Sequence, residues 1–202
     1  YQITVNKGNP DAALGQATKT YEATYRWPFQ LHGMMGPSCA VADVGKDRAT
    51  LYSGTQGSFG TRKAVAELLG FPEQNVRVLY REASGSYGRM GADDVSEDAA
   101  LLSRAVGKPV RVQWMRDDEH GWEPKGPARL DIVRAGVDAQ GTIIAWDFSD
   151  RGFPLTAASG GGLRLLASRQ IGMNPTAGGN PNGTAGGGEM YAFENQKCAA
   201  PL

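Results

Sequence analysis

The chain has 202 residues, enough for one sizeable core or two small ones, and 41% hydrophobic with 21% charged residues is ordinary for a globular protein. Its 21 Lys and Arg balance its 21 Asp and Glu, which excludes the basic field that a nucleic-acid-binding protein needs. The sequence has no run of 18 apolar residues, so we expect no membrane-spanning helix.

The first eighty residues carry the patterns of several strands and one long helix. In chain order we expect a short helix at 10–16, a strand at 18–27, a hairpin of 39–44 with 50–53, a helix at 58–69 and a strand at 75–80. The long helix has an apolar stripe, and Gly70 followed by Pro72 is a strong stop signal.

The second half of the chain predicts one more helix and a second hairpin. We expect a helix from about 93 to 106, a strand at 110–115, a polar segment from 117 with a turn at 122–124, and a hairpin of 129–137 with 142–149. This order of elements lacks a clean parallel doubly wound repeat. We therefore expect an α+β (mixed α/β) fold of mixed sheets with two main helices.

The residues after 150 change character. Eleven glycines fall between Gly152 and Gly188, where only Arg164 and Arg169 are charged. Few side chains there can bury area against the backbone entropy, so we expect a long glycine-rich loop that another part of the protein must cover.

A glycine-rich turn, Ala83-Ser-Gly-Ser-Tyr-Gly-Arg-Met-Gly91, joins the strand at 75–80 to the following helix. Its glycines let the backbone bend sharply and approach a ligand, and its amides can face an anion. One alternative is a nucleotide site, but the turn is one residue short of the dinucleotide fingerprint, and the nearest suitable acid, Asp117, is too far along the chain. Another is a tight turn with no ligand.

Four further features have simple structural explanations when taken alone. Gln56 is a neutral amide between a strand and a helix, where capping or packing would explain it. The acidic residues at 93–98 fit a solvated helix start that the helix dipole stabilises. His32 and His120 have no second ligand at zinc spacing, so we expect no metal held by the chain's own side chains. The two cysteines, Cys39 and Cys198, are expected to be independent thiols.

Several short pieces, taken in order, carry a family resemblance. They are His32-Gly-Met-Met-Gly-Pro37 (H-A-x-M-E-P, with Gly36 for the usual Glu), Thr55-Gln-Gly-Ser-Phe-Gly60 with Arg62 and Leu69-Gly-Phe-Pro72 (T-Q-x-P-x-x-x-R…L-G-x-P), Gly85-Ser-Tyr-Gly88 (G-G-F-G) and Pro109 to Glu119 (R-P-V…R-x-E). Over 21–150 the chain resembles the first molybdenum-cofactor-binding part of the xanthine dehydrogenase/aldehyde oxidase large subunit. The Ser-Tyr-Gly-Arg turn and the segment 191–195 look most like the isoquinoline 1-oxidoreductase and nicotinate dehydrogenase type.

The resemblance implies roles for a few residues. Gln56 matches the glutamine that hydrogen-bonds an oxo ligand of molybdenum, and a neutral amide can do this without adding charge. Tyr87 matches the aromatic residue beside the metal centre. The backbone of Gly85, Ser86 and Gly88 matches the turn that lies close to the cofactor, and Arg89, next in sequence, could reach an anionic group.

The resemblance also implies a setting. The longer subunit would carry a molybdopterin-type molybdenum cofactor and oxidise aldehydes or N-heterocycles with oxygen from water. It would work with an iron–sulfur small subunit and possibly a cytochrome c subunit. Residues 1–150 would form the first molybdopterin-binding-type domain, and 151–202 a glycine-rich loop with a truncated C-terminal segment.

The family's general base lies outside this chain, and Gly188-Glu189 resembles its Gly-Glu motif only superficially. The catalytic residues therefore stay unknown, and this chain alone is expected to be inactive. Bacterial cytoplasm and periplasm both stay open as its location. The alternative of a different class is a non-catalytic binding or scaffold module of the same fold.

Overall fold

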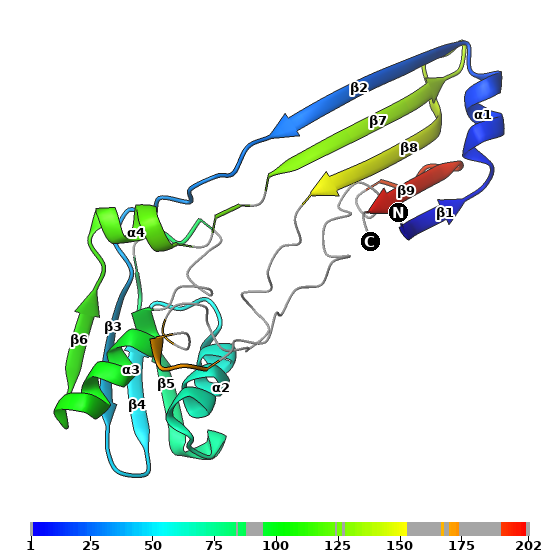
Figure 1. The fold of residues 1–202 in the computed structure, drawn as a ribbon. Helices are drawn as coiled ribbons and strands as arrows, with labels where there is room; N and C mark the ends of the chain where they lie inside the picture. The colour runs from blue at the N-terminus through cyan, green and yellow to red at the C-terminus, as the bar shows by residue number, and fades with distance from the viewer. Residues whose placement is uncertain are drawn as a thin grey trace. The chain divides into compact units, whose positions relative to one another are not determined.

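The computed structural model describes residues 2–83, 85–87, 95–123, 125–126, 128–152, 167, 170–173 and 191–200. The chain divides into two compact units (Figure 1). Unit 1 comprises residues 1–30, 126–156 and 179–202, and unit 2 comprises 31–125 and 157–178. Each unit has a sheet and its own buried cluster, so each is described by itself.

Unit 1 is a five-stranded sheet in the order β1-β9-β8-β7-β2. Its elements are β1 (Gln2–Lys7), α1 (Pro10–Gln16), β2 (Lys19–Trp27), β7 (Arg129–Val137), β8 (Ile143–Gly152) and β9 (Gln196–Ala200). β2, β7 and β8 pair antiparallel in a meander, whereas β9 pairs parallel with β8 and antiparallel with β1. The strand at 18–27 and the hairpin at 129–149 are thus confirmed. β1 and β9, which join the two ends of the chain, were not expected from the sequence.

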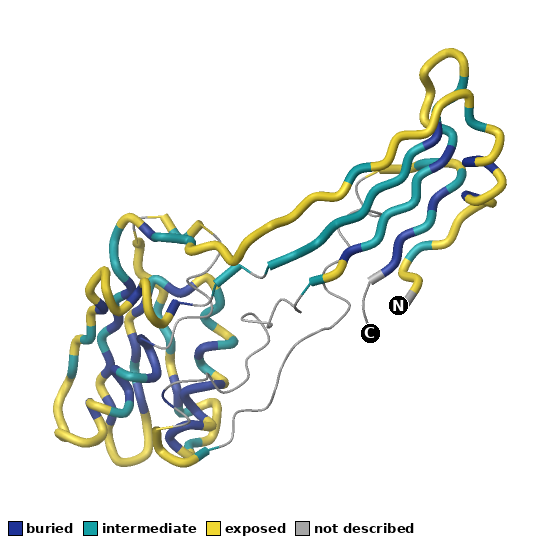
Figure 2. Tube along the Cα trace, turned by 45° about the horizontal axis from the view of Figure 1, so that its top comes forward, coloured by how far each residue is buried: buried dark blue, intermediate teal, exposed yellow. Residues whose placement is uncertain are grey.

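The short helix α1 packs on one face of this sheet. Ala13 and Leu14 of α1 form a small buried cluster with Ala145 of β8. Gly136 of β7 lies directly beneath, because a Cβ there would stand 2.8 Å from the Cβ of Ala17. The glycine therefore permits the close approach of α1 to the sheet. β2 is exposed along nearly its whole length (Figure 2).

Unit 2 is a four-stranded sheet in the order β5-β4-β3-β6, with helices on one face. Its elements are β3 (Cys39–Val44), β4 (Ala49–Ser53), α2 (Ser58–Leu69), η1 (Glu73–Asn75), β5 (Val76–Tyr80), α3 (Val95–Val106), β6 (Val110–Gln113) and α4 (Arg116–Trp122). β3 runs antiparallel to β4 and to β6, and β4 runs parallel to β5, so β4, β5 and β6 share one direction.

The core of unit 2 lies between this sheet and the helices α2 and α3. Alternate residues of the strands, such as Ala42 and Leu51, meet Val65 of α2 and Ala99 of α3, and all four are fully buried. Figure 2 shows the buried residues along the inner strands and the two helices. α2 ends at Gly70, whose φ of 68° is the left-handed conformation that the stop signal predicted.

Two expectations for unit 2 need correction. The polar segment from 117 is not irregular but forms the helix α4, because Asp118 accepts from the Met115 amide and caps its start. The acidic start of α3 is not simply solvated: Glu97 is buried, and Asp98 accepts a hydrogen bond from the indole of Trp114 (3.2 Å). Residues 93 and 94 lie outside the described residues.

Two other expectations concern cysteines and membranes. Cys39 and Cys198 are both free thiols, as expected, one in each unit. None of the helices in the described part of the chain is long and apolar enough to cross a membrane.

Candidate functional site

The predicted site residues that the structure describes, Gln56, Gly85, Ser86 and Tyr87, follow strands that end at one edge of the sheet of unit 2. Because β4, β5 and β6 run in the same direction, their carboxyl ends meet at this edge, and β3 enters the sheet there. We call it the carboxyl edge; it comprises residues 32–38, 54–57, 81–83, 85–87 and 114–116. In α/β sheets such an edge is the usual place for a ligand.

A buried hydroxyl network shapes the loop that carries Gln56. The Thr55 amide donates to Ser53 Oγ (3.2 Å), and the hydroxyls of Thr55 and Thr61 lie 3.1 Å apart. The amide of Gly57 donates to Thr55 Oγ1 (3.1 Å). Gln56 is exposed between these anchored residues. The network therefore fixes the backbone on both sides of Gln56 while its amide side chain faces outward.

The same network reaches the helix that follows the glycine turn. Ser96, in the first turn of α3, donates to Ser53 Oγ at 3.0 Å. The Arg81 amide donates to the Ser53 carbonyl at 2.9 Å, which holds the end of β5 beside the end of β4. Ser53 thus ties together the two segments that carry Gln56 and the turn. Sequence reasoning missed Ser53, because a single serine at a strand end gives no distinctive pattern.

The glycine turn is bent as its composition predicts. Gly85 has a φ of +63°, and Tyr87 has a φ of +47°, which is unusual for a non-glycine residue. A Cβ on Gly85 would lie 3.4 Å from the Tyr87 ring, so the aromatic ring folds back over the glycine. Tyr87 is 58% exposed, and Ser86 is half-buried. Gly88 and Arg89 lie outside the described residues, as does Gly188-Glu189.

A cavity of about 280 Å³ opens on the sheet face that α2 and α3 leave uncovered. Its lining includes Pro37 from the segment before β3, Gly54 from the Gln56 loop and Ala83 from the start of the glycine turn. The guanidinium of Arg81 lies over the ring of Tyr52 at 5.0 Å and borders the cavity. The cavity therefore joins three of the segments that form the carboxyl edge.

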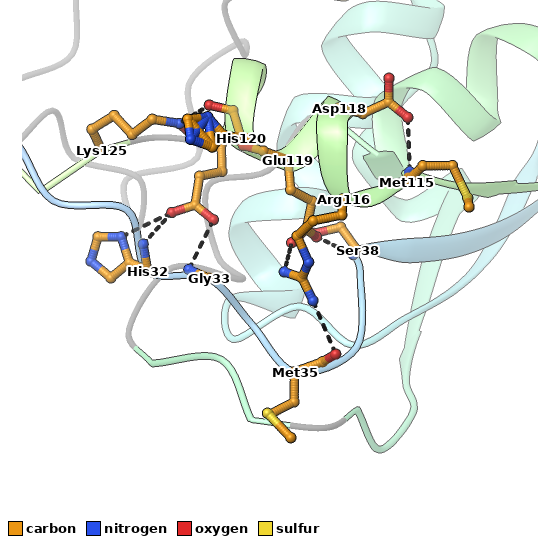
Figure 3. Close-up of polar contacts among 11 residues, drawn as sticks. His32, Gly33, Met35, Ser38, Met115, Arg116, Asp118, Glu119, His120 and Lys125 are labelled. Carbon is orange, nitrogen blue, oxygen red and sulfur yellow. Dashed lines mark hydrogen bonds and ion pairs between the residues drawn. The ribbon is translucent and has the colours of Figure 1, made fainter.

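Helix α4 holds the segment 32–38 with two buried carboxylates (Figure 3). Glu123 accepts from the amides of His32 (2.5 Å) and Gly33 (3.3 Å), and Glu119 accepts from the amide of Ser38. Arg116 bonds Glu119 (3.1 Å). The resemblance had matched Glu119 without giving it a role, and nothing in the sequence had pointed to Glu123. Their i, i+4 spacing would have been the available signal, had α4 been expected.

The titratable group at this edge with a displaced pKa is on α3. Burial raises the pKa of the Asp98 carboxyl, and the hydrogen bond from Trp114 opposes this shift. Among the described residues, no three His, Cys, Asp or Glu side chains group in a way that would hold a metal ion.

The described residues fit a bound cofactor that brings its own charge. Gln56 presents a neutral side-chain amide, and the glycine turn presents the exposed Tyr87 phenol, whose ring packs against Gly85. Both stand at the carboxyl edge, where the cavity opens. These donors suit the oxygen atoms of an anionic organic group.

Known proteins that resemble the chain share a molybdopterin cofactor-binding domain with it. A model of the molybdopterin cofactor-binding domain matches residues 1–151. The chain is 44% identical over 147 residues to a subunit of the nicotinate dehydrogenase from Pseudomonas putida, which is 73% of this chain and 12% of that protein. It is 33% identical over 143 residues to the aldehyde oxidoreductase molybdenum-binding subunit PaoC of Escherichia coli, which is 69% of this chain and 19% of that protein.

Solved structures show the same fold. Aldehyde oxidoreductase from Desulfovibrio gigas matches with a TM-score of 0.74 at 17% identity, over 98% of this chain and 21% of that one. Quinoline 2-oxidoreductase from Pseudomonas putida matches with a TM-score of 0.65 at 18% identity, over 74% of this chain and 19% of that one. This agreement confirms the expected α+β class.

The chain thus spans less than a fifth of the length of these curated relatives, several of which are named as subunits. The family model covers three quarters of the chain and includes Gln56 and the glycine turn, so the resemblance seen in the short motifs extends over most of the sequence. The chain belongs to the molybdopterin cofactor-binding domain family, in the xanthine dehydrogenase and aldehyde oxidase group of molybdenum-binding subunits.

Proposed function

We propose that this chain supplies one wall of the molybdenum site in a hydroxylase large subunit. The observation that carries the proposal is the convergence of the Gln56 loop and the glycine turn at the carboxyl edge, both tied to Ser53. The longer protein would oxidise aldehydes or N-heterocycles with oxygen derived from water. The names of the relatives, which include nicotinate, xanthine and aldehyde enzymes, support this range of substrates.

The residues of this chain would bind and orient the cofactor. Gln56 would donate its amide to an oxo group, and Tyr87 would pack beside the metal centre. The backbone of Gly85, Ser86 and Gly88 would face the cofactor, and Arg89 would reach an anionic group. The cofactor itself, when bound, would supply the two-electron redox chemistry and the oxygen transfer.

Two further proposals concern the whole protein. An iron–sulfur small subunit would take the electrons away, with a cytochrome c subunit as a further candidate partner; the naming of several relatives as subunits of complexes supports the existence of other subunits. Residues 1–150 would form the first molybdopterin-binding-type domain, which the family match over 1–151 supports, and 151–202 would form the glycine-rich loop and the segment that follows it.

The test is made on the full-length subunit that contains this chain. We expect it to co-purify with molybdenum, and Gln56→Ala to lower kcat at least about tenfold while the molybdenum content stays unchanged, since one oriented hydrogen bond to the reacting centre is lost. Gln74→Ala is the matched control, because Gln74 is an exposed glutamine beside β5 at the opposite end of the strand from the glycine turn.

Two measurements on the full-length subunit separate the alternatives. A full-length subunit without molybdenum would contradict the proposal and favour the non-catalytic module. Saturable micromolar binding of a nicotinamide cofactor would favour the nucleotide-binding alternative instead.

A further inference from the structure

Polar side chains hold the segment 32–38, in which Met34 and Ser38 are buried and only Met35 is exposed. The amides of His32 and Gly33 donate to Glu123, and the amide of Ser38 donates to Glu119. Arg116 donates to the Met35 carbonyl at 3.1 Å and to Glu119 at 3.1 Å. Four backbone groups within seven residues are therefore fixed by three side chains that lie on α4 or, for Glu123, directly after it (Figure 3).

This arrangement is costly for a short connecting segment. Glu119 is fully buried and Glu123 is 4% exposed, and removing carboxylates from water is expensive even when they are well bonded. Lys125 offsets part of the local charge, since its ammonium donates to the carbonyls of Glu119, His120 and Glu123 at the end of α4. Apolar side chains would hold this segment at a lower desolvation cost. The ionic frame, by which we mean Arg116, Glu119 and Glu123, therefore indicates that the exact placement of 32–38 matters.

The frame presents one methionine and buries the other. Met34 is 1% exposed and anchors the segment in unit 2, whereas Met35 is 72% exposed. In Figure 3 the Met35 side chain points away from Arg116 and the two glutamates. The exposed Met35 side chain buries little apolar area, yet the Met35 carbonyl accepts a hydrogen bond from Arg116. The residues that follow, Gly36 and Pro37, line the cavity at the carboxyl edge.

We propose that Arg116, Glu119 and Glu123 are positioning residues that hold Met35 directly before the cavity-lining residues Gly36 and Pro37, where its exposed thioether packs against an aromatic substrate. The thioether suits this task because it is apolar, polarizable and able to pack against the edge or face of a ring. The substrate part of this inference rests on the proposed function, and the frame itself does not. Met35 is thus a specificity-determining residue that favours aromatic over small aliphatic substrates.

The first experiment tests the frame in the 202-residue chain. Glu123 accepts from two amides, and a glutamine has one acceptor oxygen, so Glu123→Gln loses at least one of these bonds. We expect hydrogen exchange of the His32 and Gly33 amides to quicken about tenfold or more in this variant. Glu67→Gln, on the exposed side of α2, is the matched control and should leave these amides unchanged. Unchanged exchange in Glu123→Gln would overturn the frame.

The second experiment tests Met35 in the molybdenum-loaded full-length subunit. For an aromatic N-heterocycle, Met35→Ala should raise KM about 3- to 10-fold with kcat and molybdenum content unchanged, because a sulfur–aromatic contact is lost. KM for a small aliphatic aldehyde should not change. Met35→Leu should restore most of the affinity, and Leu102→Ala, which shortens an exposed apolar residue of α3, should have no effect.

The outcomes are distinguishable. An unchanged KM for the aromatic substrate in a loaded enzyme overturns the role of Met35 alone. A subunit without molybdenum overturns that role together with the proposed function, while the exchange experiment still decides the frame. An equal rise in KM for aromatic and aliphatic substrates would show a general loosening of the site and would overturn the specificity role.

Discussion

Ser53 is the residue whose replacement should loosen the Gln56 loop most directly. Its hydroxyl accepts from the Thr55 amide and from the Ser96 hydroxyl, and both Ser53 (3% exposed) and Ser96 (1% exposed) are closed to water. In Ser53→Ala these two donors lose their acceptor in a place where water cannot replace it. Each unsatisfied buried group costs about 1–3 kcal/mol, and because the Ser96 hydroxyl can rotate to relieve part of the loss, we expect a total of about 2–4 kcal/mol.

The cost should appear in unit 2 and should depend on Ser96. The slowest-exchanging amides of β4 report the free energy of unfolding of unit 2 without interference from unit 1. Ser53→Ala should lower this free energy by the amount given above. Ser96→Ala removes one of the two stranded donors, so the double variant should cost about 1 kcal/mol less than the sum of the single variants.

Additive effects would refute this reasoning. If the two single variants summed within about 0.3 kcal/mol, the hydroxyls would not be coupled, and the connection between β4 and α3 would not depend on this bond. A loss below about 1 kcal/mol for Ser53→Ala would show that the Thr55 amide finds another acceptor. In either case Ser53 would not be the tie that holds the Gln56 loop beside the turn.

Three other predictions concern titrating groups. Burial is the largest cause of the raised pKa of Asp98 and of Asp131. The charge of Asp150, which faces Asp131, raises the pKa of Asp131 further. When folding raises a pKa, the folded protein binds the proton more tightly than the unfolded chain does. The resulting stability is fully present below the pKa of the unfolded chain, about 3.8, and is lost as the pH rises through the pKa of the folded protein. Asp98→Asn and Asp131→Asn should therefore flatten the pH dependence of stability above pH 4 and raise the unfolding midpoint at pH 7; a lower midpoint would contradict this. Burial also raises the pKa of the Cys198 thiol, so iodoacetamide at pH 8 should modify half-buried Cys39 first and Cys198 only on unfolding, as peptide mass spectrometry can show.

Local patterns were sufficient to predict most of the fold. The helix at 58–69 has an apolar stripe that matches its buried face and a glycine stop, and both features act within a few residues of sequence. The hairpin at 129–149 is set by alternation and a tight turn. β1 and β9 escaped prediction because they pair with each other across almost the whole chain, and no local pattern links two segments so far apart in sequence.

The sequence predicted the exposed residues of the site but not the buried residues that hold its segments in place. Gln56 and the glycine turn stood out because short motifs and turn chemistry mark them. Glu119 and Glu123 were missed because α4 is short and polar, so its composition gives the same pattern as a loop. Their burial depends on amides of residues 32–38, which lie more than eighty residues earlier in the chain.

The supports of the carboxyl edge share a property that bears on its chemistry. Below the exposed surface of the edge, the Ser53 hydroxyl accepts from the Thr55 amide and the Ser96 hydroxyl. The buried carboxylates of Glu119 and Glu123 accept from backbone amides of the segment 32–38. In front of the edge, the described residues present the neutral amide of Gln56, the phenol of Tyr87 and the thioether of Met35. These three groups are neutral, while the cavity lining also includes the oppositely charged Arg81 and Glu82. Such a surface suits a cofactor whose electron count changes during the reaction, because no fixed charge among these three groups favours one redox state over the other.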